Sequence, residues 1–434
     1  MNAAGGNALG LYFSIPFCRS KCTYCNFASG VHPAGEHARY VERLIEDLAG
    51  ARAWAARMGV ELPRCVDTVY MGGGTPSLLE PDLLARLFRA MRTEFDLDPG
   101  AEITVECAPG QLADPTLAAL AAGGVNRVSL GVQSFIDREA RASGRLHSRS
   151  TVEKDFERLR AAGIANLNVD LIAGLAGQTF ASWEESLGAL VDCGVPHASV
   201  YMLEVDEDSR LGRELLAGGS RYHAGLVPTD DAITQMYTRA IERLEEAGLR
   251  QYEISNFSRP GFESRHNLRY WLRRPYLGVG LDASSMAFHA AASRTSVVNQ
   301  VETCAVLRST TTDDLKAYLA GASDVEASWL TPAQQHEEAW FLGLRLNAGV
   351  NVGALEQEFG SAMVAPAMRV VARLAEDGLV AFDGETVRLT ARGRLLSNEV
   401  FQQFLADAAH ETPTEQMAAA LPKFSGLEPG PGWA

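Results

Sequence analysis

Short runs rich in β-branched and apolar residues alternate with longer amphipathic segments from Leu11 to about Val205. Six runs are predicted to be strands, at 11–17, 66–71, 102–106, 127–132, 167–172 and 198–203. Helical periodicity marks segments between them, at 38–58, 81–94, 114–122, 150–162 and 180–192. Because a strand–helix–strand unit is almost always a right-handed crossover, this order predicts a parallel sheet. An open doubly wound sheet and a barrel-like sheet both agree with it.

The regular alternation ends at Asp206. Residues 206–328 begin with a stretch rich in Gly, Asp and Glu, and we expect this segment to flank the sheet and link it to a C-terminal domain. Residues 329–406 are predicted to form that domain, with a winged-helix-like fold, since helical segments precede two alternating runs around Asp383-Gly384, a typical hairpin turn. The Pro- and Gly-rich residues 407–434 are predicted to be a loose tail.

Composition argues against several classes of protein. Asp and Glu number 54 against 39 Lys and Arg, a net charge of -15, which disfavours the nucleic-acid binding that a winged helix could suggest. The sequence has no run of 18 apolar residues, so no membrane span is expected, and its start lacks the pattern of a signal peptide. Seven cysteines spread over 434 residues do not resemble a disulfide framework. We therefore expect a reduced, cytoplasmic protein.

Three cysteines, Cys18, Cys22 and Cys25, come directly after the first predicted strand. A zinc site is one interpretation, but no nearby Cys or His at finger-like spacing supplies a fourth ligand. A four-iron cluster normally takes four thiolates, so three leave one iron with an open coordination position. We favour the iron–sulfur interpretation, because an open position is what a catalytic or ligand-binding metal centre requires.

This CxxxCxxC motif after a first strand resembles the radical S-adenosylmethionine (SAM) superfamily. The resemblance implies a [4Fe–4S] cluster on the three cysteines, with the open iron chelated by the amino and carboxylate groups of SAM. It also implies that one-electron reduction, by an electron donor, cleaves SAM to a 5′-deoxyadenosyl radical. The implied fold is a partial (β/α)6 barrel, here continued by a C-terminal α+β winged-helix-like domain.

Glycines and polar residues come after the later predicted strands, and the carboxyl ends of parallel barrel strands share one face. The motifs YFSIPFC, GGGTP, GVQSF, LHS and NVDLIAGL are together similar to the coproporphyrinogen III oxidase-like branch of the superfamily. Ala176 departs from that branch, which usually has proline there. The similarity implies SAM contacts by a set of residues that we call the SAM group: Tyr12, Tyr24, Gly73, Gly74, Thr75, Glu106, Gln133, Arg145 and Asp170.

Two functions occur in this branch. The oxygen-independent oxidase decarboxylates two propionates of coproporphyrinogen III, and it typically has a fourth cysteine two residues after the third. Phe27 occupies that position here, and only 17 residues precede Cys18. Both features are similar to the heme chaperone type, which binds heme and passes it to client proteins. We expect a heme chaperone, with the oxidase as the alternative; the sequence identifies no catalytic residue and leaves open whether SAM is cleaved.

The blocks YEISNF (252–257) and RHNLRYW (265–271) are also similar to the heme chaperone type. His266 is the candidate iron ligand, and Tyr270 and Trp271 offer flat surfaces to a porphyrin. The alternative is that His266 is a structural residue that forms hydrogen bonds within the protein. His147 and His289 are weaker candidates.

Overall fold

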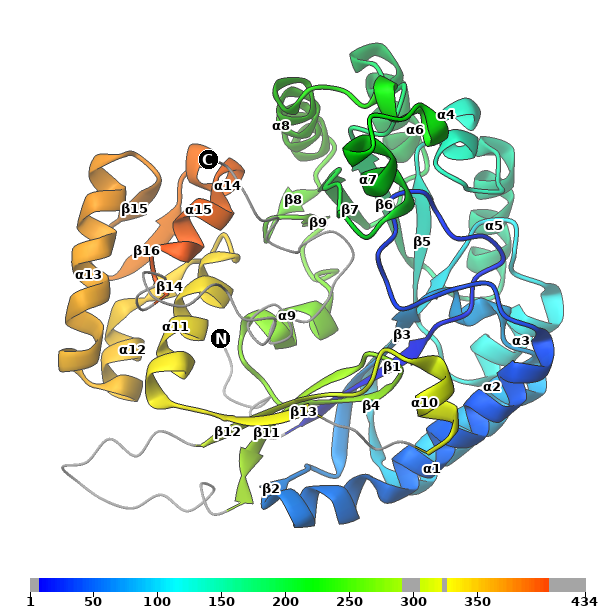
Figure 1. The fold of residues 1–434 in the computed structure, drawn as a ribbon, viewed down its shortest axis with the longest axis horizontal. Coiled ribbons are helices and arrows are strands. Elements are labelled where there is room, and N and C mark those ends of the chain that lie inside the picture. Colours follow the sequence, from blue (N-terminus) through cyan, green and yellow to red (C-terminus); the bar gives the residue numbers. More distant parts are fainter. Residues whose placement is uncertain (1–7, 291–304, 322–325, 406–434) are drawn as a thin grey trace.

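The structure, a computed structural model, describes residues 8–290, 305–321 and 326–405. The predicted tail at 407–434 lies outside these residues. A large curved sheet with helices on its outer face forms most of the molecule, and a smaller helical domain lies beside it (Figure 1). Within the described part of the chain, no helix combines the length and apolar character needed to cross a bilayer.

Six strands form the predicted parallel stretch, each paired with the next: β1 (Leu9–Ile15), β3 (Cys65–Gly73), β4 (Asp96–Cys107), β5 (Arg127–Gln133), β6 (Asn166–Ala173) and β7 (His197–Met202). The connecting helices are α1 (Ala34–Met58), α2 (Pro81–Glu94), α3 (Asp114–Ala122), α4 (Asp137–Ala142), α5 (Arg149–Ala161) and α6 (Phe180–Asp192). No strand pairing among the described residues closes the ends of the sheet, so the barrel is partial. The predicted fold class is therefore confirmed.

Residues 206–328 extend this sheet at both ends as well as linking it to the next domain. Strand β10 (Tyr276–Gly280) pairs parallel with β1 and makes a seventh parallel strand. Antiparallel strands continue beyond it: β11 (Ser284–His289), which also pairs with β2 (Val60–Glu61), then β12 (Val306–Thr310) and β13 (Glu326–Leu330). At the other end, β9 (Asn256–Ser258) and β8 (Arg250–Gln251) lie beyond β7.

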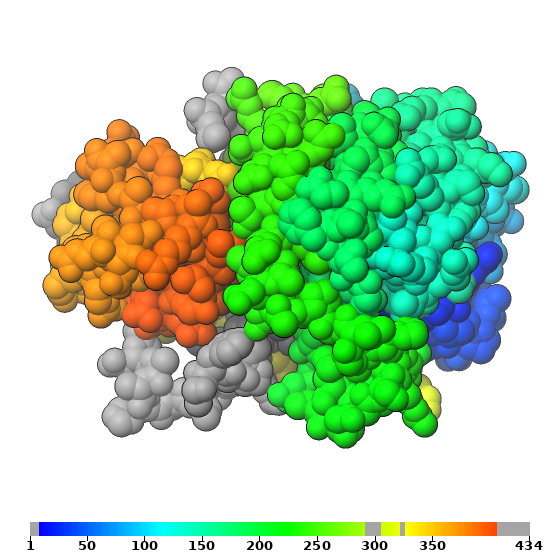
Figure 2. Space-filling model, turned by 90° about the horizontal axis from the view of Figure 1, so that it is seen from above, coloured from blue at the N-terminus to red at the C-terminus, as the bar shows by residue number. Residues whose placement is uncertain are grey.

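The helices of this segment lie around the ends of the sheet: α7 (Arg210–Leu216), the 3-10 helix η3 (Arg221–Leu226), α8 (Asp230–Glu246), α9 (Arg265–Trp271) and α10 (Leu315–Leu319). In the space-filling view, the orange and red C-terminal domain abuts the green residues of this segment (Figure 2). One contact between them is the ion pair of Arg273 with Glu358, at 2.6 Å.

The C-terminal domain has its own core around Trp340, whose ring stacks on Phe404 with centroids 4.9 Å apart. Its elements are α11 (Pro332–Leu344), β14 (Val350–Asn351), α12 (Val352–Phe359), α13 (Ser361–Glu376), β15 (Val380–Phe382), β16 (Thr386–Leu389), α14 (Ala391–Leu395) and α15 (Ser397–Gln402). The predicted hairpin is present as β15 and β16. After the hairpin the chain forms two short helices, α14 and α15, rather than one long helix, because Leu396 between them leaves helical geometry (φ −112°, ψ 34°).

The two faces of the parallel strands carry different chemistry, which prepares the site. Along β1, the side chains of Leu11, Phe13 and Ile15 belong to the apolar core between sheet and helices. Tyr12 alternates with them, and it pairs in register with Tyr70 of β3. Because successive side chains of a strand point to opposite faces, Tyr12 and Tyr70 face the barrel interior, on the side of the sheet away from the helices.

Candidate functional site

A cavity of about 1160 Å³ opens at the carboxyl ends of the parallel strands. Cys18, Cys22 and Cys25 line it, and so do all nine residues of the SAM group. The convergence that strand order predicts is therefore present in the structure. Phe27, at the position of the missing fourth cysteine, lies in the same wall.

The cysteine loop is held in place by hydrogen bonds from its own backbone and from one lysine. The Cys18 N–H donates to the carbonyl of Gly30 (2.8 Å). The Lys21 ammonium donates to the carbonyls of Phe27 (3.0 Å) and Ser29 (3.1 Å). The loop is thus tied across its own base, and its three thiols are presented to the cavity.

The glycine loop after β3 lies directly against the strand that leads into the cysteines. Gly73 has φ 98°, a conformation that favours glycine. A Cβ on Gly74 would lie 2.7 Å from the carbonyl oxygen of Ile15 and 2.8 Å from that of Phe17. The Gly74 and Thr75 N–H groups donate to these same two carbonyls, each at 2.8 Å. A larger residue at position 74 would therefore push the backbone that leads into the cysteine loop away from the glycine loop.

Two side chains of the SAM group approach the sulfurs. Thr75 Oγ1 lies 4.0 Å from Cys18 Sγ, and Arg145 Nη1 lies 3.6 Å from Cys22 Sγ. Burial raises the pKa of the Cys25 thiol to about 11 and also raises the pKa of Cys18, so without a metal these thiols are neutral at pH 7. The positive charge of a metal centre would favour the thiolates.

The described residues include no group of three or more Cys, His, Asp or Glu side chains arranged to hold one metal ion. A [4Fe–4S] cluster makes a different demand, because each thiolate binds a separate iron. Three thiols spaced around one end of a cavity therefore fit such a cluster better than they fit a single zinc ion.

Two carboxyl groups, Glu106 and Asp170, lie deeper in the cavity. Burial raises the pKa of Glu106 to about 7; the hydrogen bond from the Tyr70 phenol (2.8 Å) opposes this, and the neighbouring Asp170 adds to it. Burial likewise raises the pKa of Asp170, whose oxygens accept hydrogen bonds from Ser129 (3.0 Å) and Asn168 (2.7 Å). The Arg127 cation favours ionisation of both groups.

Gln133 offers a hydrogen-bond acceptor in the wall of the cavity. Its backbone has φ 66°, which is uncommon for a residue with a side chain, and its Oε1 is buried without a hydrogen-bond partner in the described structure. Buried polar atoms are nearly always hydrogen-bonded. An unpartnered acceptor in the wall of this cavity fits a ligand that carries N–H or O–H donors, such as the amino and ribose groups of SAM.

Tyr70 is not among the residues predicted for the site, although it lines the cavity and its hydroxyl donates a hydrogen bond to Glu106. A signal was available, since Tyr70 is two residues before the glycine loop and so faces the barrel interior.

The residues proposed for heme lie elsewhere. His266, Tyr270 and Trp271 do not line the cavity, and His266 is fully buried. Its Nδ1 lies 3.0 Å from Thr68 Oγ1 and its Nε2 lies 2.8 Å from the Tyr270 hydroxyl. Trp271 packs under the Arg345 guanidinium, 4.2 Å from the ring centroid. Because both ring nitrogens are occupied, the structure favours the structural interpretation of His266 over iron ligation.

His147 is also buried outside the cavity lining, and burial lowers its pKa to about 4.

Comparison with known proteins decides the family. Residues 12–190 match the radical SAM superfamily, and residues 330–396 match the HemN C-terminal domain. The heme chaperone HemW of Lactococcus lactis is 33% identical over 91% of this chain and 97% of its own length. The chain belongs to the HemW family of radical SAM proteins. The HemW of Bacillus subtilis is likewise 33% identical, over 91% of this chain and 99% of the relative.

The solved structures add a likeness of fold. Coproporphyrinogen III oxidase (HemN) from Escherichia coli superposes with a TM-score of 0.75, at 22% identity, over 92% of this chain and 90% of that enzyme. At this identity the likeness shows that this chain shares the fold of that enzyme, and nothing about its substrate.

Proposed function

We propose that this chain is a heme chaperone, which binds heme and transfers it to client proteins. The observation that carries the proposal is the similarity, over nearly the full length, to relatives named heme chaperone HemW. Phe27 supports it, because the oxidase type of the branch typically has a cysteine at this position.

We further propose that Cys18, Cys22 and Cys25 hold a [4Fe–4S] cluster and that the SAM group binds SAM beside it. When bound, the cluster supplies the electron that can cleave SAM. The roles of the chain's own side chains come from their chemistry. The Arg145 guanidinium pairs with a carboxylate, while Glu106 and Gln133 accept hydrogen bonds from amino and ribose donors.

The cavity is larger than the 300–1,000 Å³ or so of a usual small-molecule pocket, so a second ligand has room beside SAM. We propose that heme occupies the outer part, between the end of β7 and the C-terminal domain. The residues lining this part include Tyr201, Met202, Tyr237, Leu395, Ser397 and Asn398. The Met202 thioether is a candidate iron ligand, and no histidine is among the described residues that line the cavity.

Charge favours one orientation of the heme. Arg19 and Lys21 line the cavity from the cysteine loop, and Asp206 lies against that loop because Asn26 donates to its carboxylate (2.8 Å). Glu204, after β7, and Asp230, at the start of α8, line the cavity from other elements, so the cysteine loop carries the excess of positive charge. Two propionates would be attracted to this positive charge and repelled by the carboxylates. We therefore propose that the propionates point toward the cysteine loop.

One experiment separates the chaperone from the oxidase. Cluster-reconstituted protein is mixed with heme, and separately with coproporphyrinogen III, SAM and a reductant. A shifted Soret band without loss of CO₂ is expected. Release of CO₂ from the propionates would overturn the proposal in favour of the oxidase.

A conservative pair of variants tests the heme position. Met202→Leu keeps the apolar volume but removes the sulfur, so it should change the Soret band and weaken heme binding. Met236→Leu is the matched control, because Met236 is buried in α8 and does not line the cavity. Equal spectra for Met202→Leu and the wild type would remove Met202 as a ligand.

The partners and location are also proposals. Client proteins and an electron donor are expected from the similarity to heme chaperones, and the cytoplasm suits three thiols that must stay reduced to hold a cluster. Anaerobic incubation with SAM and dithionite, with 5′-deoxyadenosine as the product measured, tests whether SAM is cleaved.

A further inference from the structure

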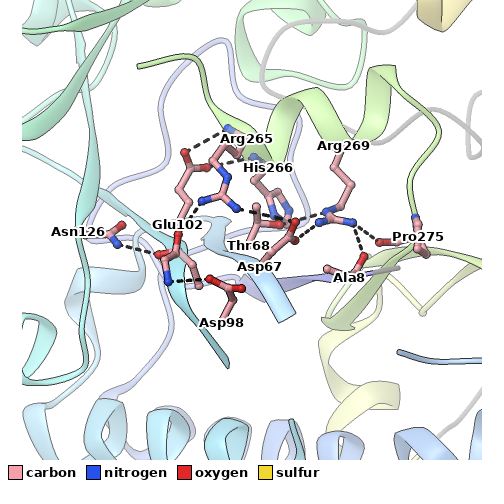
Figure 3. Close-up of polar contacts among 12 residues, drawn as sticks. Ala8, Asp67, Thr68, Asp98, Glu102, Asn126, Arg265, His266, Arg269 and Pro275 are labelled. Carbon is pink, nitrogen blue, oxygen red and sulfur yellow. Dashed lines mark hydrogen bonds and ion pairs between the residues drawn. The ribbon is translucent and has the colours of Figure 1, made fainter. Parts of the chain in front are cut away.

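Helix α9, which carries the RHNLRYW segment, is fastened to the beginnings of the barrel strands, at the end away from the cavity. The Glu102 carboxylate of β4 accepts from the backbone N–H groups of Arg265 (3.1 Å) and His266 (3.0 Å). The Arg269 guanidinium donates to the carbonyls of Ala8 (2.8 Å) and Pro275 (2.9 Å) and pairs with Asp67 (Figure 3). Helix α9 therefore covers the end of the barrel at which the strands begin.

His266 points from α9 into the barrel interior. Burial lowers its pKa well below the usual value, so the ring is neutral, and one ring nitrogen donates while the other accepts. Its partners, the Thr68 and Tyr270 hydroxyls, fix the orientation of the ring. The His266 ring is fully buried and forms a hydrogen bond through each nitrogen, so its position is fixed.

The Tyr70 ring packs against the His266 ring. The Tyr70 and His266 rings are stacked, with centroids 5.4 Å apart and planes 30° apart. Tyr12 packs against both, at 6.2 Å from Tyr70 and 6.5 Å from His266. The other end of Tyr70 reaches the cavity, where its hydroxyl donates to Glu106 Oε1 at 2.8 Å. One continuous set of contacts therefore joins His266 to the Glu106 carboxyl.

We propose that His266 is a positioning residue of the SAM site: it holds the Tyr70 ring so that the Tyr70 hydroxyl orients Glu106 toward SAM. The proposal rests on the proposed SAM site. It gives the RHNLRYW segment a role at the cluster end of the molecule, although the segment lies at the opposite end of the barrel. Neither His266 nor any other residue of α9 lines the cavity.

A double-mutant cycle tests this directly, with SAM affinity measured by anaerobic equilibrium dialysis on cluster-reconstituted protein. Tyr70→Phe removes only the hydroxyl that orients Glu106, so SAM affinity should fall several-fold, because the carboxyl must then be ordered when SAM binds. His266→Ala should weaken SAM binding several-fold in the wild type, but by less than about twofold when Tyr70 is already Phe. Equal losses from His266→Ala in both backgrounds would overturn the proposal.

Two further variants guard against a general loss of structure. Arg265→Ala removes a hydrogen bond from α9 to the Gly100 carbonyl (2.6 Å) without touching Tyr70, so SAM affinity should be unchanged. His266→Gln keeps a side chain that can form a hydrogen bond with Thr68, so this variant should retain more SAM affinity than His266→Ala. If His266→Ala does not fold, His266→Gln takes its place in the double-mutant cycle. A loss of SAM binding in Arg265→Ala equal to that in His266→Ala would also refute the positioning role.

Heme titration of the same proteins keeps this inference distinct from the proposed function. His266→Ala should bind heme with an unchanged Soret band. A changed band with unchanged SAM affinity would restore His266 as a heme ligand and overturn the positioning role. Absence of heme binding in the wild type would overturn the chaperone proposal alone, because the SAM cycle does not depend on heme.

Discussion

Ionisation of Glu106 should make the stability of the ligand-free protein fall as pH rises, and Glu106→Gln should remove the part of that fall that Glu106 causes. Burial raises the pKa of Glu106 from 4.5 to about 7 in the folded chain. A raised folded-state pKa means that the folded protein binds this proton more tightly than the unfolded chain does. The stabilising contribution is fully present below about pH 4.5 and is lost as pH rises through about 7.

The pKa values set the size of the effect. The step from 4.5 to about 7 corresponds to about 3 kcal/mol of unfolding free energy, at about 1.4 kcal/mol per tenfold change. This is an upper limit, since Glu106 is only partly buried and solvent screening reduces the effect of burial on such a group. Glutamine keeps the acceptor for the Tyr70 hydroxyl but carries no charge, so Glu106→Gln should gain stability relative to the wild type between pH 5 and 8.

Urea unfolding of the cluster-free chain, monitored by circular dichroism at pH 5, 6, 7 and 8, measures that difference. Glu157→Gln, at an exposed position of α5, is the matched control and should show no such trend. A constant difference between Glu106→Gln and the wild type over this range would refute the argument that burial governs this carboxyl.

Three other outcomes are expected. Gly74→Ala places a Cβ under 3.0 Å from backbone atoms of Ile15 and Phe17, so the iron content after reconstitution should fall well below about four per chain. Gly188→Ala in α6 is the control, because the space around Gly188 is open, and it should keep the full iron content. Cys22→Ala should abolish the cluster; stoichiometric zinc in the wild type would contradict this assignment. Glu338→Gln leaves the buried Arg308 guanidinium without its anion (2.7 Å), which should cost about 3–5 kcal/mol in urea unfolding; a loss under about 1 kcal/mol would count against a buried pair.

The six parallel strands and five of the helices between them were predictable from their periodicity and from the one handedness of parallel crossovers. The six-residue helix α4 and the two-residue strand β2 were not predicted, because neither is long enough to show a period. The convergence of Cys18, Glu106 and Asp170 was predictable from strand order alone, since carboxyl ends of parallel strands share one face. The break at Leu396 was not predictable, because the apolar periodicity continues across it while the backbone turns.

The short strands β8 to β13 left little local signal. Strand β10 is only Tyr276–Gly280 and contains two glycines, and its fully buried pattern does not alternate. Its place is set by a long-range partner, β1, that no local window includes. His266 shows the same limit, because the residue type and its aromatic neighbours suit a heme ligand, and only the three-dimensional contacts with Thr68 and Tyr70 reveal a different environment.

The parallel pairing of β1 with β10 has a consequence for synthesis on the ribosome. Leu11 finds its partner Leu277 only after roughly 270 further residues have been made, which takes about 15–50 s at about 5–20 residues per second. Until then one edge of β1 has its backbone N–H and C=O groups unpaired, a template for unwanted strand addition. Newly made chains of this length therefore depend on the early helices, or on chaperones of the general folding machinery, to keep that edge from pairing with other chains.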